Sequence, residues 1–215
     1  MTSLHVKICG LRSSDHVEVA AKAGAASIGF MFAPSRRRIE VEAARSIANQ
    51  LNRNRPELVG VFVNADVAEM MTVRRSVGLD VIQLAGDESP TVLEELQGRI
   101  WKVLRFPAGT TLQDAREAID PWLNGNHPVE AILVDASVPG AYGGTGHRAD
   151  WQLAGELASL FPVILAGGLT PSNAAEAIRQ VQPMGVDVSS GVEVDGIKDP
   201  DLIRDFLLAA HSTTQ

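Results

Sequence analysis

The chain has 215 residues and contains very little cysteine, since Cys9 is the only one. A single cysteine excludes an intramolecular disulfide and a thiolate cluster for structural zinc, and it predicts a reducing, cytoplasmic location. An excess of positive charge is also missing, because 26 acidic and 19 basic residues give a net charge of −7. Nucleic-acid binding needs a basic face, so no nucleic-acid partner is expected.

Long apolar runs are missing as well. No stretch approaches the roughly 20 apolar residues that a membrane-spanning helix needs, and the first ten residues lack the apolar core of a secretory signal. The sequence therefore predicts no membrane partner. A glycine-rich dinucleotide motif is also missing after the first apolar run, where residues 9–12 read Cys-Gly-Leu-Arg. This speaks against a Rossmann-type site.

The sequence does contain a regular alternation of short apolar runs and longer amphipathic stretches. The short runs predict strands at 4–8, 27–32, 58–63, 80–84, 100–104, 131–134, 162–165 and 185–188. The longer stretches predict helices at 14–23, 41–51, 67–76, 90–96, 112–119, 151–160, 172–181 and 201–210. Strands that are apolar along their length are typical of parallel sheets, so we predict one α/β domain over 1–215, a (β/α)8 TIM barrel. A doubly wound open sheet is the alternative.

Reactive side chains fall near the ends of several predicted strands, which is where TIM barrels carry their active sites. The first strand delivers Lys7 and Cys9, the fourth Gln83, the fifth Arg105 and the sixth Asp135. Cys9 and Asp135 would face each other across the barrel mouth as a base and an acid. Lys7 could lower the pKa of the Cys9 thiol if both side chains share a strand face. Cys9 as a small packing residue is the alternative, and Asp135 could instead cap a helix or belong to a turn.

Small residues after the last two strands indicate a phosphate site, because TIM barrels often bind phosphate there on backbone N–H groups. These residues are Gly167, Gly168, Ser189, Ser190 and Gly191. A third glycine segment, which contains Gly144 and Gly146, could close over the same group. Tight turns use such residues too, so this interpretation depends on their joint placement.

Eight segments resemble the phosphoribosylanthranilate isomerase family of tryptophan biosynthesis, in the family's order. They read KICGLR, GFMFAPSRRRI, GVFVN, QLAGDE, LVDA, GGTGHRADW, LAGGLTPSN and VDVSSGVEVDGIKDP, and they run from residue 7 to 200. The resemblance implies an isomerase that rearranges N-(5'-phosphoribosyl)anthranilate into 1-(o-carboxyphenylamino)-1-deoxyribulose 5-phosphate. It implies a small phosphorylated substrate, no metal or organic cofactor, and a monomer or homodimer.

The resemblance also implies roles for individual residues. Cys9 matches the general base and Asp135 the general acid. The family pattern Ser-x-Arg-x-aliphatic after the second strand matches Ser35 and Arg37, which would bind the anthranilate carboxylate. The loop is one residue shorter than in some relatives, so Arg38 is the alternative.

One position departs from the family pattern, because Ala85 stands where relatives often carry a histidine in the segment QLAG. Two other functions stay open at this point. One is another sugar-phosphate isomerase on the same barrel, including a dual-substrate enzyme of histidine and tryptophan synthesis. Such enzymes typically pair two aspartates, so Cys9 speaks against them. The other is a non-catalytic sensor of phosphorylated ligands; the presence of both Cys9 and Asp135 argues against it, and an activity assay would decide.

Overall fold

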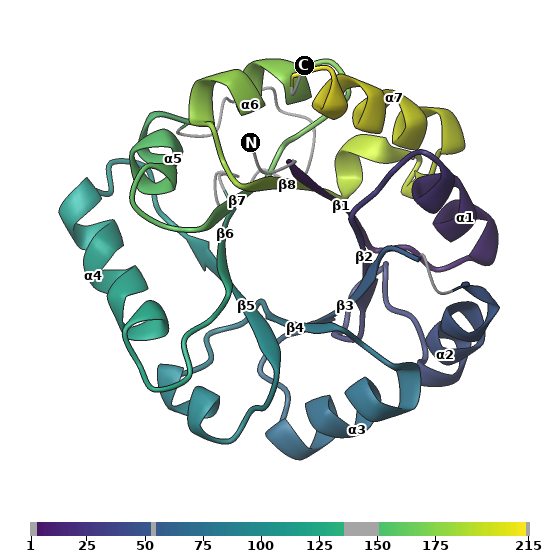
Figure 1. Cartoon of the computed structure of the whole chain (residues 1–215), viewed down its shortest axis with the longest axis horizontal. Helices are drawn as coiled ribbons and strands as arrows, with labels where there is room; N and C mark the ends of the chain where they lie inside the picture. Colours follow the sequence, from purple (N-terminus) through teal and green to yellow (C-terminus); the bar gives the residue numbers. More distant parts are fainter. Residues whose placement is uncertain (1–3, 53–54, 136–150, 214–215) are drawn as a thin grey trace.

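The computed structural model describes residues 4–52, 55–135 and 151–213, and in them eight parallel strands close into a barrel inside a ring of helices (Figure 1). The strands are β1 (His5–Cys9), β2 (Ser27–Met31), β3 (Glu57–Phe62), β4 (Val81–Leu84), β5 (Arg99–Arg105), β6 (Ala131–Asp135), β7 (Val163–Ala166) and β8 (Gly185–Val188). Because β1 pairs with both β2 and β8, the barrel is closed. The predicted (β/α)8 barrel is confirmed, and the open sheet is wrong.

The surrounding helices lie close to the predicted ranges. They are α1 (Ser14–Lys22), α2 (Val41–Gln50), α3 (Val67–Val77), α4 (Leu112–Leu123), α5 (Trp151–Ala158), α6 (Ala174–Val181) and α7 (Pro200–His211). α7 begins where the sequence suggests, since the Asp199 carboxylate accepts hydrogen bonds from the N–H groups of Asp201 and Leu202, both at 2.9 Å. Pro200 fits the first helical position, where its missing N–H leaves no bond unmade.

Two segments differ from the predicted elements. The helix expected at 90–96 is a short 3-10 helix, η1 (Pro90–Glu94). The Glu88 carboxylate, just before this segment, accepts from the Gly86 N–H, and the Ser89 hydroxyl caps the short helix by accepting from the Thr91 N–H. After β8 and the 3-10 turn η2 (Ser190–Val192), a small antiparallel hairpin of β9 (Glu193–Val194) and β10 (Ile197–Lys198) was not predicted.

The apolar strand residues pack on both faces of the sheet. One face meets the helices in a large core that includes Ile8, Phe30 and Leu165. The other face fills the barrel interior with a second cluster, made of Cys9, Val59, Val61, Val81, Ala85, Trp101, Val103, Ala131, Leu133 and Ile164. Cys9 therefore belongs to the interior face of β1. Among the described residues, no helix is long and apolar enough to cross a bilayer.

Candidate active site

The carboxyl ends of the strands meet at one mouth of the barrel, as in every parallel barrel of this kind. Cys9 is the last residue of β1 and Asp135 the last residue of β6. Around the closed barrel β6 is three strands from β1, by way of β8 and β7, so the two strands lie apart on the barrel wall (Figure 1). The barrel thus places the thiol and the carboxylate on separate strands, at the same mouth.

Cys9 lies beside a buried ion pair. Lys7 is fully buried, and its Nζ lies 2.9 Å from Asp187 Oδ1, which reaches it from β8. The Lys7 ammonium also interacts with the Cys9 thiol. A Cβ added to Gly29 would lie 2.8 Å from Cys9 Sγ and 3.1 Å from Lys7 Nζ, so a bare glycine on β2 makes room for both. The strand stays regular here, and Lys7 and Cys9 share one face.

Burial and neighbouring charges have opposing effects on the pKa values of Cys9 and Lys7. Burial raises the pKa of the Cys9 thiol, while the charge of Lys7 opposes that shift and the Asp187 carboxylate adds to it. Burial alone would lower the pKa of Lys7, but Asp187 and Cys9 outweigh it, so the ammonium stays charged. The site therefore holds a charged Lys7 beside the Cys9 thiol, whose pKa lies above its ordinary value.

Among the described residues, Asp135 meets a cation, Arg105. Arg105 lies opposite Asp135 in the β5–β6 register, and Arg105 Nε is 3.4 Å from Asp135 Oδ2. The same guanidinium donates from Nη1 to the Ala85 carbonyl at 3.3 Å. Both side chains keep contact with solvent, since Arg105 is 53% and Asp135 22% exposed. The predicted acid Asp135 and the predicted substrate-binding residue Arg105 are therefore brought together at the rim.

Gln83 provides a polar group inside the barrel. It lies two residues before Ala85 on β4, on the same strand face, and it is buried. Its Oε1 has no hydrogen-bond partner in the part of the chain that the structure describes. An unpaired buried acceptor is costly unless a ligand or water meets it, so this oxygen is suited to contact a substrate in the mouth.

The predicted phosphate loops after β7 and β8 contact each other. A Cβ on Gly191 would lie 1.8 Å from the Leu169 carbonyl oxygen, so only glycine allows this approach. Gly167 and Gly168 both have positive φ angles, of 88° and 65°. Close loops with small residues expose backbone N–H groups, as phosphate binding requires. The third predicted glycine segment, with Gly144 and Gly146, lies outside the described residues.

Two serines complete the loop after β8. The Ser189 hydroxyl donates to the Cys9 carbonyl at 3.3 Å, which links this loop to the end of β1. Ser190 begins the 3-10 turn η2. The Ser189 hydroxyl is therefore engaged with the protein, and the backbone of the loop is the part suited to an anion.

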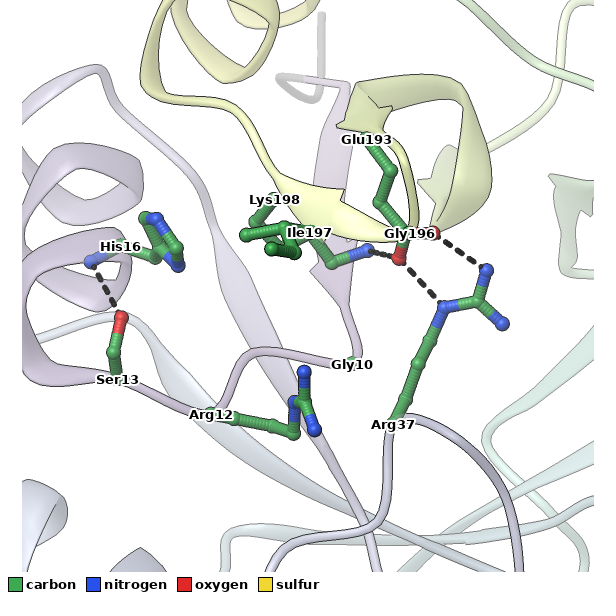
Figure 2. Close-up of a pocket in the computed structure, with 9 residues that line it drawn as sticks. All are labelled: Gly10, Arg12, Ser13, His16, Arg37, Glu193, Gly196, Ile197 and Lys198. Carbon is green, nitrogen blue, oxygen red and sulfur yellow. Dashed lines mark hydrogen bonds and ion pairs between the residues drawn. The ribbon is translucent and has the colours of Figure 1, made fainter.

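Arg37 lies at the edge of the mouth, close to β1. Its stem covers Gly10, because a Cβ there would lie 2.7 Å from Arg37 Cδ. Its guanidinium binds Glu193 on the β9–β10 hairpin through two bonds, Nε to Oε1 at 2.6 Å and Nη2 to Oε2 at 2.8 Å (Figure 2). Arg38 instead pairs with the exposed Glu40 at 3.5 Å. Of the two predicted arginines, Arg37 is the one that packs against the residue following Cys9.

A cavity of about 320 Å³ opens next to this arginine (Figure 2). It is bounded by the loop after β1, the start of α1 and the hairpin; its lining residues are Gly10, Arg12, Ser13, His16, Arg37, Glu193, Gly196, Ile197 and Lys198. Most of its charged side chains are cations, and Glu193 is the one acidic residue among them. The cavity therefore has the polarity expected for an anionic group.

Sequence reasoning missed Asp187, Glu193 and Lys198. Asp187 could have been recognised from the sequence, because a charged residue within the apolar run Gly185–Val188 needs a partner when buried. The hairpin could have been recognised as well, since Asp195-Gly196 is a typical two-residue turn and both residues have positive φ angles. Neither signal identifies the partner, which only the folded barrel supplies.

Known proteins resemble this chain along almost its whole length. The family model of N-(5'phosphoribosyl)anthranilate (PRA) isomerase matches residues 6–209. An N-(5'-phosphoribosyl)anthranilate isomerase of Roseiflexus sp. (strain RS-1) is 46% identical over 99% of this chain and 100% of that protein. The crystal structure of phosphoribosyl anthranilate isomerase from Thermotoga maritima superimposes with a TM-score of 0.86 at 34% identity, over 97% of this chain and 99% of the other.

A further solved structure carries a ligand. It is a phosphoribosyl anthranilate isomerase in complex with reduced 1-(o-carboxyphenylamino)-1-deoxyribulose 5-phosphate, with a TM-score of 0.81, 31% identity, and coverage of 97% of this chain and 99% of the other. The family match covers almost the whole barrel, including every described element that carries a predicted site residue. The chain therefore belongs to the N-(5'-phosphoribosyl)anthranilate isomerase family of tryptophan biosynthesis.

Proposed function

We propose that this enzyme converts N-(5'-phosphoribosyl)anthranilate into 1-(o-carboxyphenylamino)-1-deoxyribulose 5-phosphate, with Cys9 as general base and Asp135 as general acid. The observation that carries this proposal is the pair itself, a thiol on β1 and a carboxylate on β6 at the same mouth. Family membership supports it, as does the likeness to a solved isomerase that holds a reduced form of the product.

The reaction needs a proton donor and a proton acceptor on two sides of the sugar. Asp135 protonates the ribose ring oxygen, the ring C–O bond breaks, and the aniline nitrogen forms a protonated Schiff base with C1. Cys9 then removes the proton from C2, and the electron pair of that bond neutralises the iminium. The resulting enolamine tautomerises to the ketone, and the two side chains return to their starting states by exchanging protons with water. The net change is an isomerisation, so placement and proton handling account for the catalysis.

Lys7 acts through Cys9 in this proposal. Its Nζ is buried between Asp187 and the thiol, so the ammonium favours the thiolate that must form before the C2 proton is removed. Lys7 was predicted as a substrate contact, and its engagement by the two neighbours favours the indirect role. Gln83, with a free buried oxygen, and Arg105, at the rim beside Asp135, are proposed as contacts to the opened sugar.

The two charged ends of the substrate would bind on either side of the mouth. The phosphate is assigned to the backbone of the contacting loops, which contain Gly167, Gly168, Ser189, Ser190 and Gly191. The anthranilate carboxylate is assigned to Arg37, and the packing of its stem on Gly10 favours it over Arg38. Gly144 and Gly146 remain predicted phosphate contacts.

The test is steady-state turnover of freshly prepared N-(5'-phosphoribosyl)anthranilate, followed by the loss of anthranilate-type fluorescence. We expect Cys9→Ser and Asp135→Asn each to lower kcat by several orders of magnitude, with thermal unfolding close to that of the wild type. Near-normal turnover by Cys9→Ser would return Cys9 to the role of a packing residue. No turnover by a folded wild type would favour another phosphorylated sugar substrate or a phosphorylated-ligand sensor.

The biological setting is proposed on sequence grounds. A cytoplasmic location rests on the single cysteine and stays a prediction. Either a monomer or a homodimer fits what is known of similar proteins, since one solved relative is described as monomers of the dimeric isomerase of Thermotoga maritima.

A further inference from the structure

We propose that Glu193 is a positioning residue for the substrate carboxylate, because it binds one edge of the Arg37 guanidinium and thereby presents the other edge to the barrel mouth. This inference rests on the proposed function, in which Arg37 binds the anthranilate carboxylate. It adds a residue from the β9–β10 hairpin, outside the eight strands of the barrel, to the recognition of that group.

The two bonds between Glu193 and Arg37 use a defined part of the guanidinium. Glu193 accepts from Arg37 Nε at 2.6 Å and from Nη2 at 2.8 Å. A guanidinium has five N–H donors in a fixed plane, so three remain: two on Nη1 and one on Nη2. Donors on Nη1 and Nη2 form the outer edge of the fork and can bind a second carboxylate in a bidentate manner. Arg37 can thus hold Glu193 and the substrate at the same time.

Glu193 is itself held firmly, so it can act as a fixed reference. Its side chain is only 3% exposed. Lys198 Nζ lies 2.8 Å from its Oε1, and Arg36 Nη2 lies 3.0 Å from its Oε2. Lys198 is anchored in turn by a bond from Nζ to the Ser189 carbonyl at 2.7 Å. The carboxylate is therefore tied to the loop after β8, which carries the proposed phosphate site.

The charge balance leaves this cluster attractive to a further anion. Three cations, Arg36, Arg37 and Lys198, surround the single carboxylate of Glu193. The cavity beside them adds Arg12 to its lining. An ion-pair network that only stabilised the fold would have no need for this excess, whereas a substrate carboxylate would balance part of it.

The position of the Arg37 stem explains why the orientation matters. It lies across Gly10, the residue directly after Cys9, so its guanidinium is held a short way from the proposed base. Without Glu193 the long side chain could occupy other rotamers, and binding the substrate would require ordering it again. Pre-ordering should therefore lower KM and leave the chemical step nearly unchanged.

The experiment compares two substrates in the full-length enzyme. Both N-(5'-phosphoribosyl)anthranilate and N-(5'-phosphoribosyl)aniline, which lacks the carboxylate, are supplied, and products are separated by liquid chromatography. For Glu193→Gln we expect KM for the anthranilate substrate to rise roughly 10-fold with kcat within about 2-fold, as for the loss of one charge-assisted contact. With the aniline substrate, KM should be the same for wild type and variant. The double variant Glu193→Gln/Arg37→Ala should be no worse than Arg37→Ala alone.

A control glutamate is available at the other end of the barrel. Glu57 also forms a bidentate pair with an arginine, although it binds Nη1 and Nη2 of Arg99, at 2.5 and 3.2 Å, and not the Nε edge; the pair lies where β3 and β5 begin. Glu57→Gln should change neither KM. If Glu193→Gln does not fold, Glu193→Asp keeps the charge on a shorter arm, and it should raise KM for the anthranilate substrate alone.

The possible outcomes are distinct. If Arg37→Ala raises KM for the anthranilate substrate and neither Glu193 variant does, the positioning role is refuted and the proposed function stands. An equal rise for both substrates would also refute it, because that is the behaviour of a residue that only stabilises the fold. If the wild type does not convert N-(5'-phosphoribosyl)anthranilate at all, the proposed function fails and the present inference fails with it.

Discussion

Replacing Gly29 with alanine is expected to slow turnover by about 100-fold. The added Cβ would lie 2.8 Å from Cys9 Sγ, 3.1 Å from Lys7 Nζ and 3.2 Å from Cys9 Cα. Ordinary contacts between such atoms are about 3.5–4.0 Å, so the sulfur would have to move by roughly 1 Å. A displacement of that size in a reacting group lowers the rate by about two orders of magnitude.

The same substitution should also lower the free energy of unfolding, because the cost of overpacking exceeds the gain from replacing a strand glycine. Alanine in place of glycine within a strand contributes about 0.5–1 kcal/mol. Overpacking costs about 1–3 kcal/mol, so the net change in the free energy of unfolding is a loss on the order of 1–2 kcal/mol. In a Cys9→Ala background most of this loss should disappear, because the nearest atom is gone. If it persists, the strain comes from the Cys9 backbone instead.

The assays are the fluorescence-based turnover of N-(5'-phosphoribosyl)anthranilate and thermal unfolding of the same preparations. Gly125→Ala is the control, since beyond its chain neighbours no described atom lies within 4 Å of its added Cβ, and it should match the wild type in kcat. A Gly29→Ala enzyme with wild-type kcat would refute the reasoning. Either the thiol could then move without consequence, or Cys9 would not be the base.

The remaining predictions concern charge. Asp187→Asn removes a carboxylate that raises the pKa of the Cys9 thiol, so the rising limb of kcat/KM against pH should move to lower pH; a move to higher pH would mean that Asp187 matters more for orienting Lys7. Glu193 makes the free energy of unfolding depend on pH, because its ion pairs lower the pKa of its carboxyl from 4.5 to about 2. This contribution, on the order of 3 kcal/mol, is complete above pH 4.5 and is lost as the pH falls towards 2. Denaturant unfolding at pH 7 and pH 3 should show a larger loss for the wild type than for Glu193→Gln, and equal losses would contradict the assignment.

The architecture of this protein could largely be predicted from its sequence. Strands and helices follow the local alternation of apolar and polar residues, and eight repeats of that alternation leave few folds to choose from. Strand ends follow from the same pattern, so the sequence alone places Cys9 and Asp135 at the mouth of the barrel. The α-helix predicted at 90–96 is wrong in type and length, because the local apolar pattern does not distinguish it from the short 3-10 helix that Pro90–Glu94 forms.

The charged contacts that complete the site were decided by the tertiary structure alone. Lys7 and Asp187 are neighbours only because closure of the barrel pairs β1 with β8. Arg37 meets Glu193 only because the hairpin after β8 folds over the loop after β2. Local propensity sets which residues become strands and helices, whereas register and closure set which distant charges meet. The orientation of Arg37 and the charge beside Cys9 belong to that second kind of information.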